Sequence, residues 1–270
     1  MNKVSPVRRK GVYLIPNLFT TGNLFSGFYS VISVFNADYL LAAYAILAAT
    51  IFDSLDGKVA RFANATSRFG TEYDSLADLI SFGLAPGILI YSWALHSYNR
   101  LGWVASFLFV VCGALRLARF NVQSGSQDPR YFTGLPIPAA AITVAMMVIV
   151  DNHILRLGSE IKPVIILTMT YALAFLMVST IKYRSFKDIN FKSKRSFQYL
   201  VWAVLLFGVI ALEPVIMLFS LILLYAVSGP VARPFRGLWP KKLKEDLETD
   251  EEDDELDEEE HYPSRPRHSR

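Results

Sequence analysis

The sequence predicts an all-α membrane protein, a polytopic helical bundle with about eight transmembrane helices. Its 270 residues are 53% hydrophobic and only 19% charged, whereas soluble domains contain roughly 25% charged residues. Long apolar stretches recur along the chain, each near the roughly 20 residues that an α-helix needs to cross the hydrocarbon core. Basic residues gather in alternate connections between these stretches, which is typical of a membrane protein with a defined orientation.

The first apolar stretch begins close to Met1. A basic segment at residues 1–12 precedes it, but polar residues in PNLFTTGN interrupt the apolar region and no small-residue cleavage site is evident. We therefore expect a retained helix and not a cleaved signal peptide. The seventh stretch is the shortest, and Pro214 marks the turn before the last one. The expected spans are residues 16–36, 39–61, 73–95, 101–120, 136–153, 163–181, 197–211 and 214–230.

The basic residues predict the orientation of these spans. With the N-terminus in the cytoplasm, the connections on the other side of the membrane carry only Arg100, Arg156 and Lys162. The cytoplasmic connections are much richer in Lys and Arg, as the positive-inside rule requires. An even number of spans then returns the C-terminus to the cytoplasm. We expect a bacterial-type cytoplasmic (inner) membrane protein, with both termini on the cytoplasmic side.

Charge divides the chain into two parts. The first 229 residues carry 19 basic and 11 acidic residues, whereas residues 230–270 carry 8 basic and 13 acidic ones. We expect a membrane-embedded domain at residues 1–230 and a disordered, acidic cytoplasmic tail at residues 231–270. The overall charge of +3 averages two unlike parts, so it gives no reason to expect nucleic-acid binding. A single cysteine, Cys112, excludes a disulfide framework and a cysteine-based zinc site.

Four aspartates lie where the second and third expected spans meet the membrane surface. Asp53 and Asp56 are three residues apart, and Asp74 and Asp78 are four apart, so each pair occupies one helix face. The two spans are antiparallel neighbours, and the pairs can therefore face each other. Acidic groups this close to hydrocarbon are unfavourable unless they are neutralised. Oxygen ligands of this kind favour Mg²⁺ or Mn²⁺, and two such ions would suit phosphoryl transfer.

Small residues surround these carboxylates. Gly57, Ala60 and Gly70 leave room for a bulky group to approach the helix backbones. Arg61 lies one turn nearer the cytoplasm than Asp56, where it can contact a diphosphate or anchor the helix at headgroup level.

The aspartates and small residues form one motif with fixed spacing. The motif resembles the signature of the CDP-alcohol phosphotransferases, D-x-x-D-G-x-x-A-R-x8-G-x3-D-x3-D. Further stretches, PNLFTTGNLFSG, YDSLADLISFGLAP, LRLARFN and FTGLPIPAAA, resemble the phosphatidylserine synthase branch of that family. The positions that match the signature are Asp53, Asp56, Gly57, Ala60, Arg61, Gly70, Asp74 and Asp78.

The resemblance implies an integral membrane enzyme, commonly a homodimer, with a six-helix core and an active site at the cytoplasmic boundary. It implies CDP-diacylglycerol as donor, L-serine as acceptor and CMP as leaving group. Asp53, Asp56 and Asp74 would bind one metal ion, and Asp53, Asp74 and Asp78 a second one. Asp78 would also be the general base. The CDP moiety would lie along Gly57, Ala60, Arg61 and Gly70.

Serine as acceptor calls for a cation that binds its carboxylate. Arg116 and Arg119 are three residues apart at the cytoplasmic end of the fourth span, and arginine binds carboxylates through two parallel hydrogen bonds. We expect these two residues, assisted by Asn121, to bind the acceptor. Positive-inside anchoring explains the same arginines equally well.

Other functions remain open at this point. The same chemistry with glycerol 3-phosphate or inositol phosphate would need a denser cationic pocket, and choline would favour an aromatic cage. An ion-coupled transporter would place its carboxylates near the bilayer midplane between inverted repeats, and the sequence has no such repeat. A phospholipase-D-type mechanism would need an H-x-K motif, which none of the four histidines begins.

Overall fold

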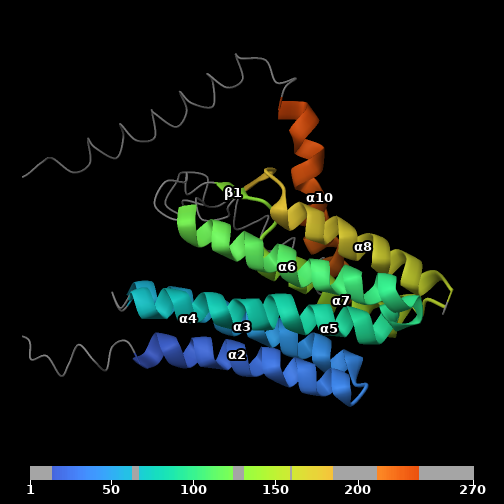
Figure 1. The fold of residues 1–270 in the computed structure, drawn as a ribbon, viewed down its shortest axis with the longest axis horizontal. Helices are drawn as coiled ribbons and strands as arrows, with labels where there is room; N and C mark the ends of the chain where they lie inside the picture. Colours follow the sequence, from blue (N-terminus) through green and yellow to red (C-terminus); the bar gives the residue numbers. More distant parts are fainter. Residues whose placement is uncertain (1–13, 63–66, 124–130, 159, 185–211, 237–270) are drawn as a thin grey trace, which may run out of the picture. The chain divides into compact units, whose positions relative to one another are not determined.

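The structure is a computed structural model, and it describes residues 14–62, 67–123, 131–158, 160–184 and 212–236. The described chain is almost entirely helical, as predicted (Figure 1). The α-helices are α2 (Leu14–Phe35), α3 (Tyr39–Phe62), α4 (Arg68–Asp78), α5 (Ala85–Ile90), α6 (Asn99–Gln123), α7 (Ile137–Val150), α8 (Ile161–Val178) and α10 (Pro214–Arg236). The π-helical segments are η1 (Leu79–Leu84), η2 (Tyr91–Leu95) and η4 (Asp151–Leu155), and η3 (His96–Tyr98) is a 3₁₀ turn. Two short strands, β1 (Tyr131–Thr133) and β2 (Lys182–Arg184), complete the fold.

Six helical segments of the described chain are long and apolar enough to cross a membrane. One of them, Arg68–Gln123, contains 56 residues, and the chain reverses within it at Asn99, where φ is 45°. Helices therefore occupy seven of the eight expected places. The remaining one, the seventh expected span at residues 197–211, lies outside the described residues. So do the basic segment 1–12 and residues 237–270 of the expected tail, whereas residues 231–236 belong to α10. The count of eight spans is not confirmed.

Helix α7 forms the centre of the packed helices. Helices α3, α5, α6 and α8 and the segment η1 all pack against it. Almost every residue from Ala139 to Val150 is buried. Small residues permit this close packing, which is how helices associate in lipid. A Cβ atom on Gly113 of α6, for example, would come within 2.7 Å of the Ile137 Cδ1 atom of α7.

The strands β1 and β2 were not predicted from the sequence. They pair antiparallel, with Phe132 opposite Tyr183. The Tyr183 side chain is buried, and its hydroxyl donates to the Ala226 carbonyl of α10 at 3.0 Å. Burial raises the pKa of Tyr183 to about 12, so the phenol stays protonated and remains a donor. Gly229 provides the space for this ring, because a Cβ there would overlap it. The strand pair thus ties the segment after α8 to α10.

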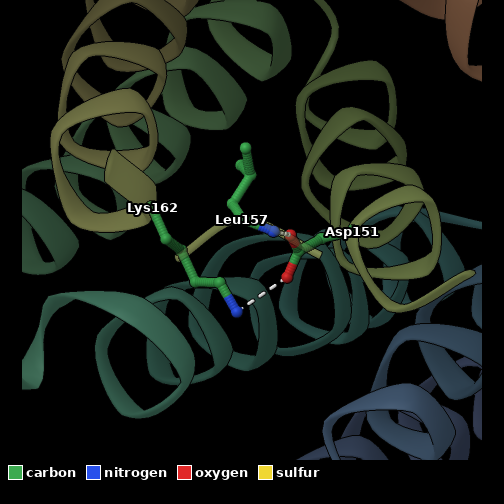
Figure 2. A network of polar contacts seen from close by, with 3 residues as sticks. All are labelled: Asp151, Leu157 and Lys162. Atoms are coloured by element: carbon green, nitrogen blue, oxygen red, sulfur yellow. Dashed lines mark hydrogen bonds and ion pairs between the residues drawn. The ribbon is translucent and has the colours of Figure 1, made fainter. Parts of the chain in front are cut away.

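The connection between α7 and α8 is held by a buried carboxylate (Figure 2). Asp151 accepts a hydrogen bond from the Leu157 amide at 2.7 Å and forms an ion pair with the Lys162 ammonium at 2.7 Å. The Lys162 ammonium also lies 5.1 Å from the centroid of the Trp93 ring. Between these contacts the chain turns through Arg156, which has a left-handed conformation with φ of 45°. Asp151 therefore closes the turn and joins it to η2.

We expect Asp151→Ala to lower the thermal midpoint of the purified protein in detergent. The change removes both acceptors, and a buried donor without a partner costs about 1–3 kcal/mol. Glu160→Ala is the matched control, because Glu160 is an exposed carboxylate beside the same turn. Equal thermal midpoints for the two variants would show that the Asp151 contacts do not stabilise the connection.

Candidate active site

The four predicted aspartates come together where α3 meets α4. One carboxylate oxygen from each of Asp53, Asp56 and Asp74 lies within 4.8 Å of the other two. The Asp78 side chain is close enough to Asp53 and Asp74 to interact with both electrostatically. The arrangement expected from the three- and four-residue spacings is therefore present, with one pair contributed by each helix.

A local cap determines where α4 begins. Ser67 is extended, with φ of −135° and ψ of 152°, and its hydroxyl accepts a hydrogen bond from the Gly70 amide at 3.0 Å. A serine at this position is a preferred N-cap because it satisfies one of the free amides of the first turn. The helix thus starts at Arg68, five residues before the expected span, and carries Asp74 and Asp78 on its face toward α2 and α3.

Helix α2 contributes two contacts that sequence reasoning missed. The Thr20 hydroxyl donates to Asp56 Oδ2 at 3.0 Å, and the Asn23 amide donates to Asp78 Oδ1 at 3.0 Å. All four side chains are largely buried. The available signal was the three-residue spacing of Thr20 and Asn23, which places both on one helix face. Several other polar residues of α2, such as Asn17, Thr21 and Ser26, weaken that signal.

The cluster fits a divalent cation. Among the described residues, no lysine or arginine lies within ion-pair distance of the four carboxylates. Asp74 Oδ1 is buried and has no hydrogen-bond partner in the described part of the chain. Adjacent carboxylates with an unpaired buried oxygen repel one another unless a cation neutralises them. Carboxylate oxygens are the ligands that Mg²⁺ and Mn²⁺ prefer.

A cleft opens beside the cluster between α2, α3 and α4. A Cβ atom on Gly57 would meet nothing within 4 Å, so the space beside the α3 backbone at this position is open. Arg61 is exposed in the last turn of α3 and does not line the cleft. Pro16, Asn17 and Thr71 line it, although none was predicted as a site residue. The complete lining is Pro16, Asn17, Thr20, Asp56, Gly57, Ala60, Ser67, Gly70, Thr71 and Asp74.

The two arginines predicted to bind an acceptor have different surroundings. Arg116 is buried, its guanidinium lies 5.7 Å from the centroid of the Phe120 ring, and its Nε has no hydrogen-bond partner among the described residues. Asp78 is close enough to interact with it electrostatically. Arg119 instead donates to four backbone carbonyls, which belong to Thr133, Met177, Val178 and Ser179.

Asn121, the third predicted acceptor residue, connects two helices. Its side-chain amide donates to the Ser75 hydroxyl of α4 at 2.9 Å. Among the described contacts of these three residues, those of Arg116 leave a buried donor atom without a partner, whereas Arg119 closes the end of α8.

Comparison with known proteins agrees with this geometry. Residues 13–178 match the model of the CDP-alcohol phosphatidyltransferase family. A CDP-diacylglycerol–serine O-phosphatidyltransferase from Helicobacter pylori is 40% identical over 218 residues, which cover 80% of this chain and 90% of that protein. The Bacillus subtilis protein of the same name is 35% identical, over 64% of this chain and 91% of its own length. An archaetidylserine synthase from Methanothermobacter thermautotrophicus is 39% identical, over 63% of this chain and 69% of its own length.

The family and the hydrophobic helices together make this an integral membrane protein. The family model covers more than half of the chain and includes all four aspartates. The chain therefore belongs to the CDP-alcohol phosphatidyltransferase family.

Proposed function

We propose that this enzyme transfers the phosphatidyl group of CDP-diacylglycerol to L-serine and so produces phosphatidylserine and CMP. The proposal rests above all on the four converging aspartates. They form no ion pair with a lysine or arginine of the described chain, and Asp56 and Asp74 border an open cleft. The names of the similar proteins from Helicobacter pylori and Bacillus subtilis support serine as the acceptor.

The aspartates would hold two divalent cations. Asp53, Asp56 and Asp74 would bind the first, and Asp53, Asp74 and Asp78 the second. Bound Mg²⁺ or Mn²⁺ supplies neutralisation of the diphosphate oxygens and of the charge that develops on CMP. The open space at Gly57 and the small side chain of Ala60 let the CDP moiety approach the carboxylates, with Gly70 on the opposite wall.

The acceptor hydroxyl would be activated by Asp78. This carboxylate takes the hydroxyl proton while the serine oxygen forms a bond to the phosphorus attached to diacylglycerol. The bond between that phosphorus and the bridging oxygen breaks, and CMP leaves with the oxygen. Because the carboxylates lie at helix ends, the lipid chains can remain in the bilayer during the reaction.

The serine carboxylate would be bound by Arg116. A buried guanidinium with an open donor matches a carboxylate, and a serine bound there would lie near the proposed base, because Arg116 is close to Asp78. Arg119 donates its hydrogen bonds to carbonyls at the end of α8 and would therefore stabilise the fold around the acceptor site without binding serine itself.

The orientation and assembly are also proposals. The distribution of basic residues favours an active site and both termini on the cytoplasmic side of an inner membrane. The family resemblance favours a homodimer.

The decisive experiment is an acceptor assay with the purified protein and CDP-diacylglycerol. We expect labelled L-serine, in the presence of Mg²⁺ or Mn²⁺, to yield phosphatidylserine and one equivalent of CMP. A chelator should abolish turnover, and added metal should restore it. Glycerol 3-phosphate, inositol phosphate and choline serve as matched acceptors. A higher kcat/KM for any of them would contradict serine specificity, and full activity after complete metal removal would contradict the metal site.

Replacing Asp78 by asparagine tests the proposed base. General-base catalysis typically contributes about 10²–10⁴-fold, so CMP release should fall by at least roughly 100-fold while the protein remains folded. Glu72→Gln is the control, because Glu72 is an exposed acidic residue of the same helix. Wild-type CMP release by folded Asp78→Asn protein would exclude the role.

Arg116→Ala tests acceptor binding. A hydrogen bond to a charged group contributes about 1.5–3 kcal/mol, so the KM for serine should rise roughly 10- to 150-fold while that for CDP-diacylglycerol stays the same. Arg119→Ala should mainly lower the thermal midpoint, because it removes donors to four carbonyls. An unchanged serine KM in Arg116→Ala protein would remove Arg116 from the acceptor site.

A further inference from the structure

Asn23 contacts the carboxylate cluster from a helix that has no acidic residue of its own. Its side chain is fully buried, and its Nδ2 donates to Asp78 Oδ1 at 3.0 Å. An ionised carboxylate only accepts hydrogen bonds, so the contact requires the amide nitrogen to face Asp78. Asn23 is absent from the lining of the cleft. Asn23 can therefore influence the reaction through its hydrogen bond to Asp78 and not by lining the cleft.

The backbone around this contact is fixed on both sides. The Ser81 hydroxyl of η1 donates to the Asn23 backbone carbonyl at 2.9 Å. One turn further along α2, Gly27 packs directly on the Ser81 backbone, and a Cβ there would come within 2.6 Å of Ser81 Cα. Ser81 lies three residues after Asp78. Its contacts with Asn23 and Gly27 therefore fix the position of α2 relative to the chain segment that carries the Asp78 carboxylate.

The hydrogen bond limits the rotation of the Asp78 carboxylate. The amide engages Oδ1 and leaves the second oxygen, Oδ2, free of Asn23. Asp53 and Arg116 are both close enough to interact electrostatically with the same carboxylate. The Asn23 Oδ1 atom is buried without a hydrogen-bond partner among the described residues. A buried amide oxygen without a partner lowers the stability of the fold. The Asn23 side chain is therefore not explained by stability alone, whereas its hydrogen bond to Asp78 gives it a role at the site.

We infer that Asn23 is a positioning residue, which orients the Asp78 carboxylate for its role toward the acceptor hydroxyl. The inference rests on the proposed function for the role of Asp78. Partners that orient functional groups in this way typically contribute about 10- to 100-fold to activity or affinity. The effect should appear in kcat and not in KM, because Asn23 does not line the cleft.

The test compares Asn23→Ala with Asn23→Asp, which keeps the shape of the side chain and replaces the donor by an acceptor. Both variants should show kcat reduced about 10- to 100-fold, with KM values for CDP-diacylglycerol and serine within about twofold of the wild type. Ser26→Ala and Ser33→Ala are matched controls on the same helix. Their hydroxyls bond only to α2 carbonyls, at 2.8 and 2.9 Å, and both controls should retain wild-type kcat. Thermal midpoints establish that each variant is folded.

A double variant separates positioning from a general structural role. In the Asp78→Asn background, Asn23→Ala should cause no further loss of kcat, because the residue acts only through Asp78. Independent, multiplicative losses would overturn the inference, as would wild-type kcat in folded Asn23→Asp protein. If the wild-type protein itself transfers no phosphatidyl group to any acceptor, the proposed function fails, and this result is distinct from the failure of Asn23 alone.

Discussion

The structure depends on the crowding of four carboxylates at the edge of an apolar helical bundle. Asp53, Asp56 and Asp74 each have an oxygen within 4.8 Å of the other two, and Asp78 is near enough to interact with Asp53 and Asp74. Like charges at such distances repel one another, and the described residues provide these carboxylates with hydrogen bonds but no ion pair. This deficit is the reason why the cluster could hold a divalent cation. The neighbouring positions Gly57 and Ala60 are small and line the cleft, so space is left open beside the carboxylates.

The packing of the helices holds the four aspartates in place. Helix α7 is buried on nearly all sides and provides a rigid centre against which α3, α5 and α6 pack. Helix α2 pairs with α3 and also contacts α4 and η1, so the helix without carboxylates contacts both helices that have them. Its donors Thr20 and Asn23 each reach one aspartate pair. In a low-dielectric environment such hydrogen bonds are strong, and their loss leaves a buried charge less well solvated.

The two arginines show why identical residue types at helical spacing need not share a function. Arg116 and Arg119 are both on α6. Arg119 donates to carbonyls at the end of α8 and to that of Thr133 in β1, whereas the Nε of Arg116 is buried without a partner among the described residues. The difference arises from the strand pair β1–β2 and the end of α8, which surround one arginine and leave the other near the carboxylates.

Several features followed from the sequence because they depend on local chemistry. The hydrophobic lengths predicted the membrane helices, and the spacing of the aspartates predicted two pairs on facing helix surfaces. Only the tertiary structure decided what comes from distant segments: the contacts of Thr20 and Asn23 with the aspartates, the separate environments of Arg116 and Arg119, and the docking of Tyr183 on α10. Periodicity fixes which face of a helix is polar, but it does not determine which other helix packs against that face, and a hydrogen-bond partner is determined only by that packing.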